Sequence, residues 1–70
     1  MKNTTIGWKV TKDGDNYSMY ANSFKEVYDI VARLTCDVEA AIEASSWAEL
    51  AYVGEVYETR DVVIEVVELG

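Results

Sequence analysis

The feature that most constrains the fold is the segment 61–69, in which five of the nine residues are β-branched. Valine and isoleucine are stiff at χ1 and pack well on a pleated surface, so this composition predicts a strand. Its side chains alternate between two faces, with Val62, Ile64 and Val66 on one and Val63, Glu65 and Val67 on the other. Residues 55–58 either open this strand or form a separate short strand that turns at Thr59 and Arg60.

A hairpin near the N-terminus supplies two more strands. Residues 5–11 alternate between apolar and polar side chains, which puts Ile6, Trp8 and Val10 on one face. Asp13-Gly14 follows, and these residue types favour a tight turn because both tolerate positive φ. Residues 17–21 then form the return strand. Gly7, inside the first strand, marks a bulge or a close approach of another group.

Residues 24–34 predict an amphipathic helix. Ser23 is the expected N-cap, and Glu26 lies three residues later, where it completes a capping box. Apolar side chains recur at helical spacing over about three turns. They are Phe24, Val27, Tyr28, Val31 and Leu34.

Residues 37–52 form either one bent helix or two short ones. Asp37 or Thr35 can cap the first turn, and Ser46 can start a second capping box. Gly54 is well placed to end the helical region in the left-handed conformation. The apolar residues expected to face inward are Val38, Ala41, Ile42, Trp47, Leu50 and Ala51.

These elements predict an α+β fold in one domain, residues 1–70. We expect a three-stranded antiparallel sheet, or a four-stranded one if 55–58 is separate, with one to three short helices on one face. The order is β-β-α-(α)-β. Cys36 is the only cysteine, so no intramolecular disulfide forms, which favours a reducing cytosol. At a helix boundary we expect Cys36 to be a small buried residue.

The composition argues against catalysis. Histidine is absent, which removes the commonest general base, and one cysteine cannot build a zinc site. The segment 13–16 lacks the ligand spacing of a calcium loop, because the twelfth residue from Asp13 is Phe24. The four glycines are isolated, so there is no phosphate loop. We therefore expect no enzyme activity, no cofactor and no metal.

The net charge of −7 is unevenly distributed. Residues 1–36 hold five basic and four acidic residues, whereas residues 37–70 hold nine acidic residues and one arginine. This balance argues against direct binding of nucleic acid or of an anionic membrane. One interpretation is that this acidity serves solubility alone. The sharper hypothesis is a partner-binding surface made by Asp37, Glu39, Glu43, Glu49, Glu55, Glu58 and Asp61.

Two functions fit this pattern. The first is an acidic module that binds a basic protein surface, such as that of a nucleic-acid-binding protein. In size, acidity and α+β outline the chain resembles the small phage-encoded inhibitors of host defence, anti-CRISPR proteins among them. The resemblance is one of general character, and it implies action in the host cytosol against the nucleic-acid-binding site of a defence protein. The alternative is a homodimeric structural or accessory domain that pairs through the uncovered sheet face, where Val63, Val67 and Tyr20 would lie.

Overall fold

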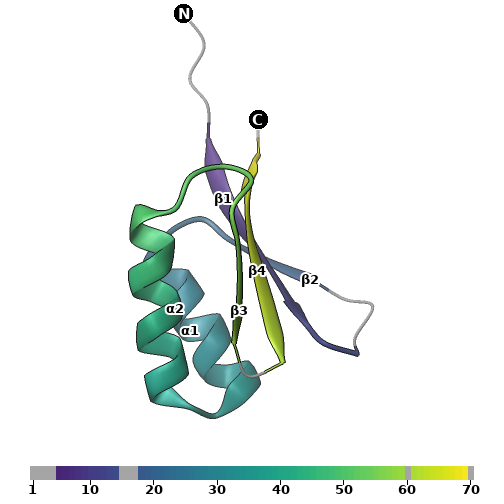
Figure 1. Ribbon diagram of the computed structural model, residues 1–70, viewed down its shortest axis with the longest axis vertical. Coiled ribbons are helices and arrows are strands. Elements are labelled where there is room, and N and C mark those ends of the chain that lie inside the picture. The colour runs from purple at the N-terminus through teal and green to yellow at the C-terminus, as the bar shows by residue number, and fades with distance from the viewer. Residues whose placement is uncertain (1–4, 15–17, 60, 70) are drawn as a thin grey trace, which may run out of the picture.

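The computed structural model describes residues 5–14, 18–59 and 61–69. The elements in these residues are β1 (Ile6–Lys12), β2 (Ser18–Ala21), α1 (Phe24–Thr35), α2 (Val38–Leu50), β3 (Val56–Thr59) and β4 (Val62–Glu68). Figure 1 shows both helices on one side of the sheet. The α+β class is confirmed. The order is β-β-α-α-β-β, because the segment after α2 forms a strand of its own.

The sheet of the described residues has four antiparallel strands in the order β2-β1-β4-β3. β4 lies between β1 and β3, and Ile64 is the register partner of both Val10 and Tyr57. The inner face of β4 buries Val62, Ile64 and Val66, and its central position pairs the backbone of this β-branched segment on both edges.

Glycine is needed at two places in the N-terminal half of the sheet. Gly14 has φ +89° directly after β1, as expected for the turn of the predicted hairpin. Tyr17, expected to start the return strand, lies outside the described residues. A Cβ on Gly7 would lie 2.7 Å from Cγ of Leu69, so this glycine leaves room for the leucine side chain beside β1.

Helix α1 begins and packs largely as predicted. Ser23 is the N-cap, and its Oγ accepts the N–H of Glu26 at 3.3 Å. The carboxylate of Glu26 accepts the N–H of Asn22 at 2.8 Å, one residue earlier than a standard capping box requires. The helix buries Val27 and Val31 and also Ile30, which the predicted stripe omitted.

Helix α2 is one continuous helix through Ser46. Asp37 is its N-cap, and the helix ends at Leu50 because Ala51 is extended. Gly54 does adopt positive φ, at +97°, but it does so three residues beyond Ala51. There it belongs to a turn in which the N–H of Glu55 donates to the carbonyl of Tyr52 at 3.0 Å, so its predicted role as the helix cap is wrong.

The core lies between the sheet and the two helices. The sheet contributes Val10, Val62 and Ile64, each no more than 1% exposed, and α1 packs Val27 and Val31 against them. Helix α2 packs beside α1 and reaches the sheet at β3, where the rings of Trp47 and Tyr57 stack 5.2 Å apart. Trp8 packs on the core as predicted, whereas Ile6, at the start of β1, is 41% exposed.

The orientation of α2 differs from the prediction. Its buried residues are Ala40, Ala41, Ala44 and Ala48. Val38, Ile42 and Leu50, expected inside, are 56%, 50% and 79% exposed. Apolar residues lie all round this helix, so amphipathicity does not choose an inner face. Small side chains let the α2 backbone approach α1 closely, and this fit turns the larger residues outward.

The predicted burial of Cys36 is also wrong, because Cys36 is exposed. It occupies the left-handed position where α1 ends, with φ 56°, and its N–H donates to the carbonyl of Ala32 at 2.9 Å. A residue in this position has left the helix, so the apolar stripe of α1 does not determine whether its side chain is buried.

Candidate partner-binding surfaces

The seven predicted partner-binding carboxylates do not form one surface. Asp37, Glu39, Glu43 and Glu49 belong to α2 and its cap, on the helical side of the molecule. Glu58 lies on β3 opposite Val63, on the sheet face turned away from the helices. Asp61 lies in the turn between β3 and β4, with φ +67°. The acidic half of the chain is therefore divided between two sides of the fold.

Asp37 and Glu55 have structural partners. The Oδ1 of Asp37 accepts the N–H groups of Glu39 and Ala40 at 3.0 and 3.2 Å and so caps α2. An Oε1 of Glu55 accepts the N–H of Tyr52 at 3.2 Å and so holds the turn before β3. Both groups stabilise local backbone, which is sufficient reason for a carboxylate at each position.

Glu39, Glu43 and Glu49 are all exposed on the outer side of α2. Glu39 in the first turn is favourable beside the positive end of the helix dipole. Glu49 lies near the opposite end, where a negative charge is unfavourable and where the last turn carries no basic residue. Glu39 and Glu43 are one turn apart and repel each other. Glu43 and Glu49 therefore destabilise the helix to which they belong.

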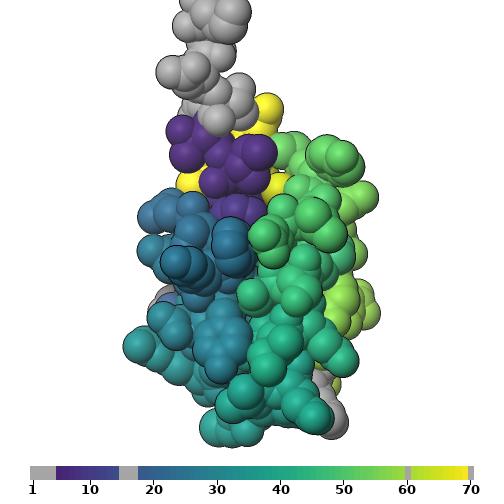
Figure 2. Space-filling model, turned by 90° about the vertical axis from the view of Figure 1, so that its left-hand side faces the viewer, coloured from purple at the N-terminus to yellow at the C-terminus, as the bar shows by residue number. Residues whose placement is uncertain are grey.

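The same side of α2 is also apolar, which the sequence reasoning missed. Val38 and Ile42 are one turn apart and about half exposed, and they lie next in sequence to Glu39 and Glu43. Figure 2 views the molecule from the helical side, with α1 in blue and teal and α2 in green lying side by side. The four alanines at helical spacing could have predicted which side of α2 is buried, because a row of alanines on one side of a helix is typical of a close contact with another helix.

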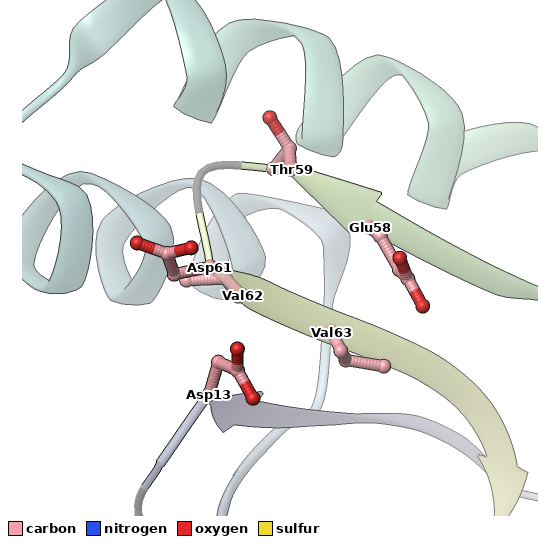
Figure 3. A pocket seen from close by; sticks show the side chains of 6 residues that line it. All are labelled: Asp13, Glu58, Thr59, Asp61, Val62 and Val63. Carbon is pink, nitrogen blue, oxygen red and sulfur yellow. The ribbon is translucent and has the colours of Figure 1, made fainter.

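A second acidic feature lies at the end of the sheet where the turn between β3 and β4 meets the end of β1 (Figure 3). An open hollow of about 360 Å³ is lined there by Asp13, Glu58, Thr59, Asp61, Val62 and Val63. The N–H of Asp13 donates to the carbonyl of Asp61 at 2.6 Å, which joins the two turns. Asp13 comes from the nearly neutral half of the chain and was not among the predicted residues.

The hollow has no arrangement suited to a metal ion. Within the described ranges, no three carboxylate or thiol groups lie close enough together to hold one. The three carboxylates of the hollow come from three separate segments and are exposed. They bring three carboxylates to this end of the sheet without forming a coordination sphere.

The sheet face away from the helices is the third candidate surface. Tyr20 and Val56, on the two edge strands, are 55% and 54% exposed. Between them, Lys9 and Glu65 are register partners of opposite charge on β1 and β4. Val63 and Val67 are only partly buried, as the sequence predicted for an uncovered face. This face is therefore mixed in polarity and close to neutral.

Comparison of the chain with protein families, with curated proteins and with solved structures found no match. None of the helices in the described residues is long and apolar enough to cross a membrane.

Proposed function

We propose that the protein is an acidic binding module that uses the outer side of α2 to bind a basic surface of another protein. One observation carries the proposal. Glu39, Glu43 and Glu49 are exposed on one helix, and no lysine or arginine occurs anywhere between Arg33 and Arg60 to neutralise them. Unbalanced charge of one sign speeds capture of an oppositely charged partner and disfavours other partners.

The inhibitory form of this proposal names a nucleic-acid-binding protein of a host defence system as the partner, with action in the host cytosol. Glu39 and Glu49 are about 15 Å apart along the helix axis, at 1.5 Å rise per residue. Three charges over that length are far fewer than the one charge per about 1.7 Å that duplex DNA presents. The partner surface therefore needs only a few matched basic groups, and imitation of a whole duplex is not required.

The experiment compares two variants with the same change in net charge. Glu39→Lys with Glu43→Lys alters α2, whereas Asp29→Lys with Glu68→Lys alters exposed carboxylates on α1 and β4. Each immobilised protein captures partners from a lysate of candidate host cells at about 0.1 M and about 1 M salt, where the Debye lengths are about 10 and 3 Å. We expect a protein captured by the wild type and by the control variant at low salt only. Equal capture by the α2 variant would contradict the proposal.

A homodimer through the open sheet face is the second candidate, favoured by the exposed Tyr20 and Val56. Four strands about 4.8 Å apart and about 20 Å long cover roughly 400 Å². Two such faces would bury about 800 Å² in total, below the roughly 1,200–2,000 Å² of stable interfaces. A weak dimer is therefore the most that this face supports. Sedimentation at high micromolar concentration decides the question, since a monomer there excludes it.

A further inference from the structure

Helix α2 buries four alanines and exposes Val38, Ile42 and Leu50, whereas its Trp47 packs on the core. The side against α1 consists of alanines that are 0–4% exposed, whereas Val38 and Ile42 are 56% and 50% exposed. Ordinary packing gives the reverse arrangement, because burial of large side chains supplies most of the stabilisation. The two exposed residues are one turn apart and so form a ridge of the kind that fits between the side chains of a second helix.

Carboxylates lie beside this ridge. Glu39 and Glu43 follow Val38 and Ile42 in the sequence, whereas Glu49, seven residues after Ile42, lies in line with the ridge near the end of the helix. A helix that packs on the ridge brings the residues flanking its own apolar stripe close to these carboxylates, as the e and g positions do in coiled coils. Lysine or arginine in those flanking positions gives charge complementarity, whereas aspartate or glutamate there would be repelled.

A second copy of this chain cannot supply such a helix. The outer side of α1 carries Lys25, Glu26, Asp29 and Arg33, all exposed, and has no apolar stripe free. Pairing α2 with α2 would place two sets of Glu39 and Glu43 together, which is repulsive. The charge pattern therefore points to a different protein.

We propose that α2 binds a basic amphipathic helix of a partner protein, with Val38 and Ile42 as the apolar contacts and Glu39 and Glu43 as the charged ones. This inference rests on the proposed function and adds the apolar half of the recognition. The 13 residues of α2 span about 20 Å, so three to four turns of the partner helix can lie along it. This mode of binding is the docking of an amphipathic helix through anchors at i and i+4.

Three synthetic peptides of about 18 residues, equal in positive charge, test the inference. The first places leucines on one face of a lysine-rich helix, the second has the same composition in scrambled order, and the third contains lysine and glutamine only. Each is titrated into the ¹⁵N-labelled full chain. We expect the first to bind at least about tenfold more tightly than the others, a difference of about 1.4 kcal/mol, and to shift the amide signals of α2.

The outcomes separate the inference from the proposed function. Equal binding of all three peptides at α2 would overturn the apolar contact and leave the acidic binding function standing. Binding of none would overturn the inference too, and the lysate capture above then decides the proposed function by itself. Binding of the first peptide with signal changes confined to the open sheet face would also overturn the inference.

Matched variants test the ridge itself. Val38→Gln with Ile42→Gln keeps the charge and places good helix formers at exposed positions, so the helix remains. Val56→Thr is the control, because Val56 is similarly exposed, at 54%, but lies on β3. We expect the double variant to lose at least about tenfold in affinity for the amphipathic peptide and none for the lysine–glutamine peptide. Retained affinity in a folded double variant would overturn the inference.

Discussion

The orientation of α2 predicts opposite outcomes for two substitutions on the same helix. Ala44 is 0% exposed against α1, and replacing it by leucine forces extra carbon atoms into a filled space. Such overpacking costs about 1–3 kcal/mol. Ile42→Ala removes three carbon groups worth about 0.8 kcal/mol each when fully buried. Because Ile42 is 50% exposed, the substitution removes only about half of this burial energy.

Alanine has a higher helix propensity than isoleucine, and this difference offsets about 0.4 kcal/mol of the destabilisation in Ile42→Ala. The net cost of Ile42→Ala is therefore about 0.8 kcal/mol, against about 2 kcal/mol for Ala44→Leu. For a domain of this size each kcal/mol lowers the melting temperature by about 4–8 °C. Thermal unfolding followed by circular dichroism should place Ala44→Leu several degrees below Ile42→Ala. Urea unfolding gives the two free energies directly.

The reverse order would refute the reasoning. If Ile42 faced the core, as the sequence pattern predicts, its truncation would cost about 2–5 kcal/mol. Ala44→Leu would then lie at an accessible position and cost little. A result in which Ile42→Ala is the more damaging change therefore means that α2 is rotated relative to the arrangement described above.

Three further predictions concern single features of the fold. Glu43→Lys should raise the free energy of unfolding by about 0.4–1 kcal/mol in urea, because repulsion by Glu39 becomes attraction; a lower value would contradict the i,i+4 geometry. Gly54→Ala should lower the free energy of unfolding by about 1–2 kcal/mol. Gly54 has φ +97° and no atom within 4 Å of an added Cβ, so the cost is one of backbone only, and an unchanged midpoint would refute the turn. A double-mutant cycle of Trp47→Ala and Tyr57→Ala should give a coupling of about 0.5–1.5 kcal/mol, and zero coupling would exclude the stack.

The features that the sequence determined by itself are local. The hairpin turn at Gly14, the N-cap Ser23 and the strand character of the last segment all follow from residue types within a few positions of one another. Each depends on one backbone preference or one short hydrogen bond, and these do not depend on contacts with distant parts of the chain. For the N-cap of α2 the sequence offered Asp37 or Thr35, and the structure has Asp37.

The tertiary structure decided how α2 is rotated and where the carboxylates lie. Apolar residues surround α2, so only the space beside α1 could select the alanines as its inner side. The separate strand β3 carries Glu58 to the opposite sheet face, away from Glu39 and Glu43. The net charge of a segment is a property of its sequence, but a binding surface requires that charges share a face. That depends on packing between elements distant in the chain, which residue patterns do not contain.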